Sequence, residues 1–511
     1  MSSFPWLTAL VLLPLVGAVV LWVLPAGPRN VVRPVALGFA LGELVLTGLA
    51  FLAFDTGRSA SYQLVELHAW IPAFGVSYAL GVDGVSIALI GMSALLLPMV
   101  VLASWHEQGS VTAATNALRR YLALVLVLQA FVVAVFAARD VFLFYVLFEV
   151  MLVPVYFMIG GYGGARRRYA AVKFLLYSLA GGLIMLVGVI ALYLKGPGGP
   201  QGFLTQNLVG LQLSTTTERL LFLAFFVAFA IKAPMFPVHT WLPDATEQAP
   251  AGTSTLLVGV LDKVGSFGML TLALPLFPNA SRWAAPVIIV LAVVSVLYGA
   301  LLAIGQRDLM RMIGYTSVSH FGFIVLGIFA FTSTSVAGAS FYMVNHGFST
   351  GALFLLAGFL ISRRGSQRID DFGGLQRVTP VLAGLFLVVG LSALALPGLS
   401  PFVSEFLVLV GTFPTVPAAA VVASVGVVLA ALYILWTYQR MFTGPVRPGL
   451  DTMKDVSHVE RWAIGPLVAV MLVLGFVPGP ALNLVRPPAQ TTVQTVGVAD
   501  LPAVASEGTA K

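Results

Sequence analysis

The sequence contains no cysteine and few charged residues. Without cysteine the chain holds no disulfide, no thiolate metal site and no cysteine-ligated iron–sulfur cluster. Charged residues make up only 9% of the 511 residues and hydrophobic residues 59%, whereas soluble proteins average about 25% charged residues. A soluble chain of this length cannot cover its surface with so few charges. We therefore expect most of the surface to face the hydrocarbon of a membrane.

Motifs for covalent chemistry and for nucleic-acid binding are also missing. The sequence has no glycine-rich phosphate loop, no nucleophile triad and no acidic cluster with metal-ligand spacing. We therefore expect no metal, no cofactor and no covalent catalysis in this chain. The net charge is +7, but nucleic-acid binding requires basic residues gathered on one face. Here they lie in separate short loops, so no nucleic-acid partner is expected.

Long apolar runs predict an all-α polytopic membrane protein of about 14 transmembrane helices. A bilayer core about 30 Å thick needs about 20 apolar residues per helix, and the runs are continuous rather than alternating, which argues against a β-barrel. The first run lacks a basic residue before it, so we expect a retained helix rather than a signal peptide. The predicted spans lie near residues 5–24, 34–54, 83–105, 120–138, 140–160, 170–194, 220–242, 250–276, 284–304, 309–331, 336–361, 379–410, 416–441 and 462–484.

Prolines interrupt the seventh and the twelfth span, at Pro234 and Pro237 and at Pro397 and Pro401. A proline breaks the helical hydrogen-bond ladder, which a membrane tolerates only beside a protein-buried or watery cavity. Broken helices at corresponding positions are typical of inverted-repeat transporters, so we expect two inverted five-helix repeats, spans 4–8 and 9–13. The predicted domains are 1–110 with helices 1–3, 118–276 with the first repeat, 284–441 with the second repeat, and 442–511 with helix 14 and a tail.

The distribution of loop cations predicts the orientation. Most Lys and Arg residues outside the spans lie in odd-numbered loops, such as Arg166 to Arg168 and the segment 363–377. Cationic residues near span ends stay on the cytoplasmic side. Both termini are therefore predicted on the outer face. The tail from Pro487 onward is poor in charge, and we expect it to be a poorly ordered end.

A few ionisable residues fall inside the predicted spans. A charged side chain at the bilayer centre costs about 3 kcal/mol, so such residues usually face the protein interior and mark ion paths. No loop is near enough for the short side chain of Glu149 to reach water. The main candidates for a proton path are Glu149, Lys232, Lys263, His320, His346 and Glu405, and the accessory candidates are Lys173, Asp262, Asp140 and His239.

Some of these residues have a second interpretation. Lys173 lies near its helix start, and its long side chain has the reach to snorkel to the interface. His320 alone is equally consistent with a hydrogen-bonded interior histidine. Asp262 precedes Lys263 but points about 100° around the helix from it, so the two need not form an ion pair. In that case the Asp262 carboxylate offsets the positive charge of a different neighbouring residue.

Proton handling is the chemistry that these residues favour. A carboxylate that moves toward or away from a buried ammonium changes whether the ammonium keeps its proton. Glu149 and Lys232 would couple conformation to protonation in this way. Lys263 and the two histidines would relay protons, with water filling the gaps, and Glu405 would exchange them at the far end.

Several stretches resemble the antiporter-like membrane subunits of proton-translocating NADH–quinone oxidoreductase, respiratory complex I. The most specific stretch is Lys232-Ala-Pro-Met-Phe-Pro-Val-His-Thr-Trp-Leu-Pro-Asp-Ala-Thr-Glu-Gln-Ala-Pro250. The resemblance covers about spans three to thirteen. It assigns Glu149 and Lys232 to a coupled pair, the central residues to a relay and Glu405 to the exit. The other stretches are Asp140 to Pro154, Arg307 to His320, Gly81 to Ser86 and Asn345 to Gly347.

Within that family, a glutamate at the twelfth-span break is similar to the M branch, whereas a lysine is usual in the paralogous L and N branches. Thr246 and Met310 depart from the family, where histidine and lysine are common, so neither is expected to relay protons. The resemblance implies a multi-pass protein of the cell inner (plasma) membrane. It also implies L, N and small membrane subunits as partners, with FMN, iron–sulfur clusters and quinone bound by other subunits.

Two alternatives remain open at this point. The first is a subunit of a multi-subunit cation/proton antiporter, which shares the same pattern and is driven by ion gradients without electron transfer. The second is a scaffold whose buried ions pair for packing. Buried ion pairs contribute little to stability, so this number of buried ionisable groups favours the two transport functions.

Overall fold

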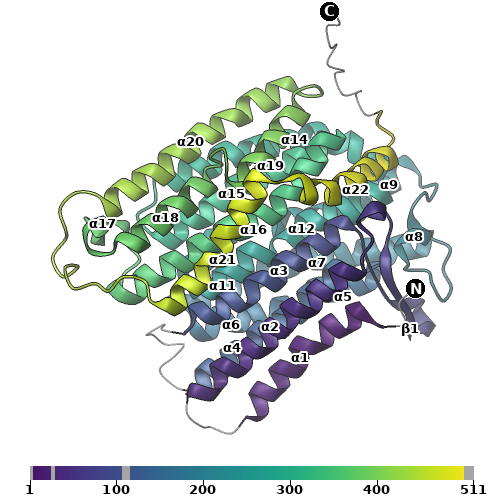
Figure 1. Ribbon diagram of the computed structural model, residues 1–511. Coiled ribbons are helices and arrows are strands. Elements are labelled where there is room, and N and C mark those ends of the chain that lie inside the picture. Colours follow the sequence, from purple (N-terminus) through teal and green to yellow (C-terminus); the bar gives the residue numbers. More distant parts are fainter. Residues whose placement is uncertain (1–3, 25–28, 106–114, 500–511) are drawn as a thin grey trace, which may run out of the picture.

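The computed structural model describes residues 4–24, 29–105 and 115–499. Figure 1 shows helices side by side with roughly parallel axes, with α1 (Trp6–Val23) and α2 (Arg29–Ala53) on one flank and α20 (Pro417–Phe442) on the opposite one. Within the described ranges, twelve helical segments are long and apolar enough to cross a membrane. The helical membrane architecture is therefore confirmed, while the count of 14 spans and the two repeats stay predictions.

The chain contains both long helices and short helical segments. Between α2 and the middle of the sequence they are α3 (Gly84–Ala103), α4 (Thr115–Ala137), α5 (Val141–Val150), α6 (Leu152–Tyr162), α7 (Arg167–Lys195), α8 (Thr205–Leu208), α9 (Thr215–Lys232), α10 (Trp241–Gln248), α11 (Ala251–Leu256), α12 (Lys263–Gly268) and α13 (Leu274–Leu276). The second half contains α14 (Pro278–Ile304), α15 (Leu309–Phe329), α16 (Ser333–Arg364), α17 (Leu375–Val378), α18 (Pro380–Ala393), α19 (Ser400–Thr412), α21 (His458–Phe476) and α22 (Gly479–Val496), besides α20.

Both predicted helix breaks are present. The first lies between α9 and α10 and contains Pro234 and Pro237. The second lies between α18 and α19 and contains Pro397, while Pro401 follows in the first turn of α19, where its missing N–H is not needed. A proline in a helix interior removes a hydrogen bond, which explains why the chain leaves the helical path at these points.

Two π-helical segments were not predicted. They are η3 (Leu257–Leu261) and η4 (Met269–Ala273), and they lie on either side of α12 within the span that runs from α11 to α13. A π-turn adds one residue to the turn and is frequent at functional sites. The apolar run at 250–276 therefore forms a helix of uneven pitch around Lys263.

A β-hairpin precedes α3 and was also not predicted. Strands β1 (Gln63–Ile71) and β2 (Val76–Val82) pair antiparallel, joined by a 3-10 turn that ends at Gly75 with φ +70°. Asp83 follows β2 and accepts a 2.8 Å hydrogen bond from Ser86 N at the start of α3. The hairpin therefore connects directly to the bundle, and the segment 55–82 contains regular structure outside the predicted spans.

The expected disorder of the tail is wrong for residues 487–496. Helix α22 runs through Pro487 and Pro488 to Val496 and packs against α3 and α16. Its buried residues include Leu484, Val485 and Val493, so burial of one apolar face offsets the low helix propensity of the two prolines. Residues 500–511 of the tail lie outside the described residues, as do residues 25–28 between the first two predicted spans and residues 106–114 between the third and fourth.

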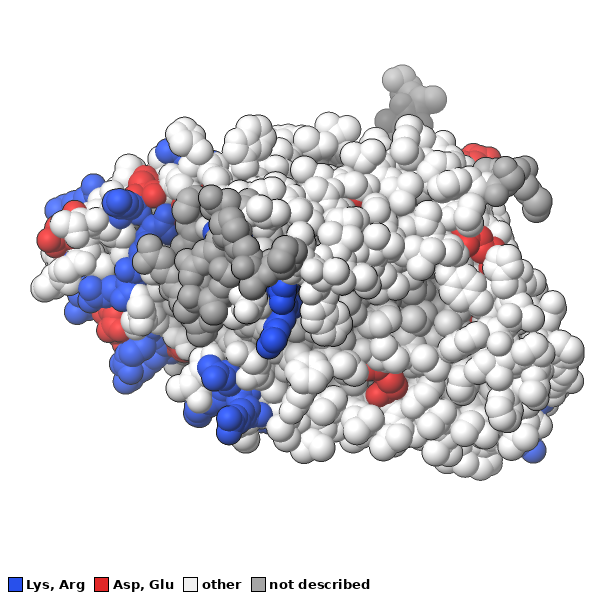
Figure 2. All heavy atoms as spheres, turned by 90° about the horizontal axis from the view of Figure 1, so that it is seen from below, with Lys and Arg blue, Asp and Glu red and all other residues white. Residues whose placement is uncertain are grey.

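Charge is distributed unevenly along the helix axes. Figure 2 shows Lys and Arg concentrated toward one end of the molecule, the end where α17 lies in Figure 1, and few at the end with the hairpin. Between the two ends most of the visible surface is uncharged. This pattern fits a protein whose middle is surrounded by hydrocarbon.

Candidate functional site

Glu149 and Lys232 lie at the ends of two helices. Glu149 is the next-to-last residue of α5, and Lys232 is the last residue of α9, directly before the break. Lys232 is fully buried, and its ammonium lies 4.7 Å from the ring centroid of Phe148. The proline-bearing break thus ends the helix at the buried lysine, which the sequence predicted.

The two groups interact electrostatically without a direct hydrogen bond. Each senses the charge of the other, yet Lys232 Nζ and Glu149 Oε1 have no hydrogen-bond partner in the described part of the chain. Gly182 on α7 provides room for the carboxylate, because a Cβ added there would overlap Glu149 Oε1. Lys232 is therefore fully buried and Glu149 only partly buried, and Lys232 Nζ and Glu149 Oε1 interact through their charges without a hydrogen bond.

Lys263 is the first residue of α12 and is fully buried. Its Nζ donates to the carbonyl oxygen of Val258 at 2.5 Å and lies 2.6 Å from Nδ1 of His346. Val258 belongs to the π-helical segment η3. The uneven pitch of this helix therefore presents a backbone acceptor to the lysine, while α16 supplies the histidine.

The two predicted histidines lie together. The rings of His320 on α15 and His346 on α16 are 5.1 Å apart between centroids and nearly perpendicular. His320 Nε2 lies 3.4 Å from the hydroxyl of Tyr433 on α20. His346 Nε2 has no hydrogen-bond partner among the described residues. Three helices therefore bring Lys263 and both histidines into one cluster.

Glu405 on α19 continues this cluster through Tyr342. The Tyr342 hydroxyl donates to Glu405 Oε2 at 3.2 Å, and the ring of Tyr342 lies 5.9 Å from that of His320. Asn345 Nδ2 donates to the carbonyl oxygen of Ser400 at 3.0 Å, which ties α16 to the start of α19 beside the break. The result is a buried polar row from Lys263 to Glu405.

Tyr342 and Tyr433 were missed by the sequence analysis. Both are fully buried, and each hydroxyl contacts one titratable side chain, Glu405 for Tyr342 and His320 for Tyr433. A signal was available for Tyr342, because it precedes His346 by four residues on one helix and therefore shares its face. For Tyr433 the sequence held no such signal, since α20 contains none of the predicted residues.

Asp262 is a buried carboxylate that interacts with the charges of both lysines. It is fully buried, and neither carboxylate oxygen has a hydrogen-bond partner in the residues that the structure describes. It interacts electrostatically with both Lys263 and Lys232. The absence of a hydrogen bond to Lys263 agrees with the different directions in which the two side chains leave the helix.

Lys173 belongs to a separate charge cluster at one end of the bundle. Its Nζ lies 2.6 Å from Asp244 Oδ2 on α10, and Arg311 Nη1 lies 2.5 Å from Asp244 Oδ1. Burial alone would raise the pKa of Asp244, but hydrogen bonds from Lys173 and Arg311 outweigh it and hold the pKa below its usual value. Glu247 also accepts from Arg311, at 2.7 Å. The lysine ammonium is therefore paired with a carboxylate.

The remaining accessory candidates occupy different surroundings. Asp140 begins α5, where its carboxylate accepts from Phe142 N and Leu143 N, and it also accepts from Ser77 N of the hairpin. His239 lies in the break after Lys232, and both ring nitrogens lack a partner in the described chain. The structure thus places Asp140 as a helix cap and His239 among the aromatic rings of Phe236, Tyr298 and Tyr315, where it senses the charge of Lys173.

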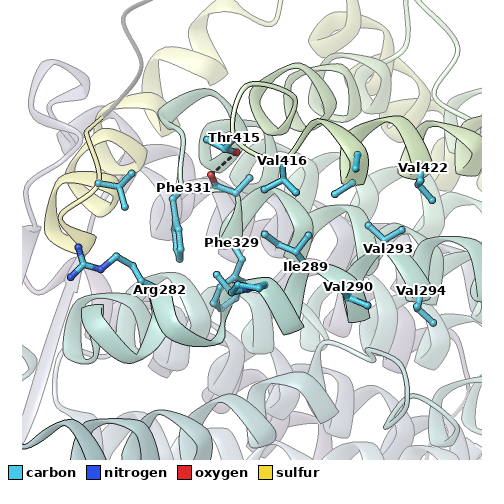
Figure 3. A pocket seen from close by; sticks show the side chains of 16 residues that line it. Arg282, Ile289, Val290, Val293, Val294, Phe329, Phe331, Thr415, Val416 and Val422 are labelled. Atoms are coloured by element: carbon cyan, nitrogen blue, oxygen red, sulfur yellow. Dashed lines mark hydrogen bonds between the residues drawn. The ribbon is translucent and has the colours of Figure 1, made fainter.

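An apolar groove of about 810 Å³ lies apart from these residues. Figure 3 shows Arg282 at one end of it and Val294 and Val422 toward the other, between α14 and α20. Its described lining includes no carboxylate and no histidine. The groove is therefore not part of the polar row. No group of three or more metal-binding side chains occurs in the described residues.

Two family models match the chain. The model described as "NADH:quinone oxidoreductase/Mrp antiporter, TM" matches residues 138–430, and the model described as "NADH-ubiquinone oxidoreductase chain 4, amino terminus" matches residues 58–135. The first match covers more than half of the chain and includes every residue of the polar row. The motif resemblance is therefore confirmed over both regions.

Curated relatives cover the whole length. NADH-quinone oxidoreductase subunit M of Mycobacterium tuberculosis is 44% identical, covering 100% of this chain and 99% of that protein. Subunit M of Rhodobacter capsulatus is 38% identical over 96% of both chains. Full-length similarity at this level confirms the M branch that was inferred from the glutamate at the second break.

Solved structures share the fold. A chain of respiratory complex I from Thermus thermophilus has a TM-score of 0.87 and 32% identity, covering 96% of this chain and 100% of that one. A chain of the Mrp complex from Dietzia sp. DQ12-45-1b has a TM-score of 0.85 at 23% identity, which reflects the fold alone. The chain therefore belongs to the NADH:quinone oxidoreductase/Mrp antiporter family of membrane subunits, in the branch of NADH-quinone oxidoreductase subunit M.

Proposed function

We propose that this chain translocates protons as a membrane subunit of an NADH–quinone oxidoreductase. Other subunits transfer electrons from NADH to quinone, and this chain contributes a translocase without a redox site of its own. The observation that carries the proposal is the buried polar row of Lys263, His320, His346 and Glu405 together with the buried Lys232 and the partly buried Glu149. Such residues inside a membrane are costly and mark ion paths.

The first element of the path is the pair of Glu149 and Lys232. Because neither group satisfies the other with a hydrogen bond, a small movement of α5 relative to α9 changes the field at the ammonium strongly. Approach of the carboxylate keeps the proton on Lys232, and withdrawal releases it. The helix end at Val150 and the break after Lys232 are points where such movement needs little deformation of a continuous helix.

The released proton then moves along the central residues. Asp262 serves as an accessory carrier between Lys232 and Lys263, since it interacts electrostatically with both. Lys263 contacts His346 directly, at 2.6 Å. The histidine pair and the Tyr342 hydroxyl lead to Glu405, which exchanges the proton at the end of the row. His239, which senses the charge of Lys173, serves as a side branch of the path, while Lys173 and Asp140 stabilise the surrounding helices.

Two inverted repeats organise this path. Spans 4–8 in residues 118–276 form one repeat and spans 9–13 in residues 284–441 form the other, flanked by 1–110 and 442–511. In support, the breaks after α9 and after α18 both adjoin a buried titratable residue, Lys232 in one case and Glu405 in the other. An odd number of helices per repeat turns the second copy upside down, which opens one half-path to each face.

The partners are other membrane subunits of the complex, including the paralogous L and N subunits, and the chain lies in the cell inner (plasma) membrane. FMN, iron–sulfur clusters and quinone belong to those other subunits. The exposed side chains of Val65, Leu67, Trp70 and Phe74 on the hairpin support contact with a neighbouring subunit, since they lie outside the spans. Both termini face outward, in agreement with the cation-rich opposite end.

The test measures NADH-driven proton pumping by the assembled complex in proteoliposomes. Lys232→Met and Glu149→Gln remove the two charges with little change in volume, and we expect a several-fold loss of protons moved per NADH. Lys195→Met, an exposed lysine at the end of α7, is the matched control and should pump normally. Normal pumping by Lys232→Met and Glu149→Gln would overturn the proposed path.

Co-purification distinguishes this function from a cation/proton antiporter. A tagged copy of this chain should bring down subunits that oxidise NADH and bind FMN. Recovery of membrane subunits alone, with transport driven by a sodium or proton gradient and unaffected by NADH, would instead support the antiporter function.

A further inference from the structure

Glu43 is a buried carboxylate on a helix at the flank of the bundle. Helix α2 lies at the edge in Figure 1, and it exposes Val45, Leu49 and Leu52 to the surroundings, with 63, 46 and 81% of their surface accessible. Glu43 on the same helix is 0% exposed. A lipid-facing helix gains no stability from an inward carboxylate, and intramembrane carboxylates are usually functional.

The Glu43 carboxylate lacks a hydrogen-bond partner. The Gln129 carboxamide of α4 lies within interaction distance of it, but the geometry does not form a hydrogen bond, and both oxygens stay without a partner in the described part of the chain. A buried ionised carboxylate without a partner is strongly unfavourable, so such a group takes up a proton. The site therefore favours a bound proton.

Among the described residues, no charged group faces Glu43 closely from the helices that pack against α2. These are α1, α3 and α4. Helices α1 and α3 contain no titratable side chain within their bounds. In α4 the titratable residues are Arg119, Arg120 and Tyr121, at least eight positions from Gln129 and thus roughly 12 Å along the helix. On α2 itself Arg33 is ten positions away.

Polar side chains lead from Glu43 toward the central row. Gln129 Nε2 donates to Ser93 Oγ on α3 at 3.2 Å, and both residues are buried. The preceding residue, Met92, packs so tightly on Gly347 that a Cβ added to the glycine would overlap the sulfur. Gly347 follows His346 on α16. Helix α3 alone therefore separates the Glu43 site from the Lys263–His346 pair.

We propose that Glu43, with Gln129 and Ser93, forms a lateral proton-binding site that exchanges its proton with the central row across α3. The proton leaves the Glu43 carboxyl as H⁺ and is accepted by His346 Nε2, which has no partner in the described residues, and it returns by the reverse step through bridging water. This inference rests on the proposed function, because it adds a side branch to the same path.

The test compares Glu43→Gln and Glu43→Asp with wild type in the assembled, reconstituted complex. Protons moved per NADH are measured across a range of pH. We expect Glu43→Gln to lower this ratio and to flatten its pH dependence, whereas Glu43→Asp keeps a carboxyl group, retains pumping and shifts the pH profile. Thr47→Val changes a buried polar residue one turn away on the same helix and should behave as wild type.

Several results would overturn the lateral proton-binding site. Wild-type pumping and an unchanged pH profile in Glu43→Gln would overturn the lateral site, and so would an effect that follows sodium concentration rather than pH. If Glu43→Gln fails to assemble, an unchanged profile in Glu43→Asp overturns it as well. Lys232→Met in the same series separates the two proposals. If Lys232→Met loses pumping and Glu43→Gln pumps normally, only the lateral site is rejected. If both variants pump normally, the proposed path is rejected.

Discussion

Gly182 is the residue whose substitution most selectively disturbs the Glu149 carboxylate. An added Cβ would overlap the carboxylate oxygen, so Gly182→Ala should displace Glu149 and lower proton pumping several-fold while NADH oxidation by the other subunits continues. Gly384→Ala is the matched control, because nothing lies within 4 Å of a Cβ added there. Pumping measured in proteoliposomes checks the result, and equal pumping by both variants would contradict it.

Tyr342 provides a second prediction at this scale. Its hydroxyl is the donor that joins the histidine cluster to Glu405, at 3.2 Å, so Tyr342→Phe should slow pumping several-fold by removing one step of the row. The ring stays, which keeps the packing. Tyr438→Phe changes a tyrosine of α20 that is only partly buried and serves as control. A Tyr342→Phe complex that pumps at the wild-type rate would remove the hydroxyl from the path.

Individual residues of the site were the most predictable part. Charged groups in apolar runs are rare enough to identify from the sequence, which is why Lys232, Lys263 and Glu405 were selected as candidates, and the structure shows all three buried. The tyrosines were not, because tyrosine is common in apolar helices and its role depends on which neighbour its hydroxyl reaches. Asp140 was selected for its position beside an apolar run, and the structure places it as a helix cap.

At the scale of elements, the charge cluster of α10 holds α7 and α15 together. Lys173 and Arg311 both contact Asp244, so Lys173→Met should lower the thermal stability of the complex more than Arg166→Gln, which removes a more exposed partner of Glu247. Losing one partner of a partly buried ion pair leaves an uncompensated charge. Equal stabilities in a thermal-shift measurement would contradict this role.

The same cluster has a defined pH dependence. Because the folded protein holds the pKa of Asp244 below its usual 3.8, the contribution of the cluster is complete above that value and is lost as the pH falls through the lower, folded pKa. The stability difference between wild type and Lys173→Met should therefore stay constant across neutral pH and shrink only in strong acid. A difference that vanishes near neutrality would contradict the ion pairing.

Helix breaks could be predicted from proline, whereas the π-helical segments and the hairpin could not. Proline excludes a helix interior by its chemistry, so Pro234 and Pro397 marked real breaks. A π-turn depends on the packing around it, here on Lys263 reaching the Val258 carbonyl, and the local sequence stays apolar and helical in pattern. Helix α22 was missed because its stability comes from contacts with α3 and α16.

For the whole molecule, the absence of cysteine makes the orientation easy to test. Ser61, which lies directly before the hairpin, and Thr452, in the loop before α21, are exposed and suit single-cysteine substitution. If both termini face outward, an impermeant maleimide should label Ser61→Cys in intact cells and Thr452→Cys only after lysis. The reverse labelling pattern would place both termini in the cytoplasm.

The central claim is that protons cross the membrane through the buried row, in which Lys263 occupies the middle. The most direct measurement is the number of protons moved per NADH oxidised by the reconstituted complex carrying Lys263→Met, with Lys195→Met as control. Lys263 is fully buried and bonded to His346, whereas Lys195 is exposed. We predict that Lys263→Met lowers this ratio while Lys195→Met keeps it; an unchanged ratio in Lys263→Met would contradict the account.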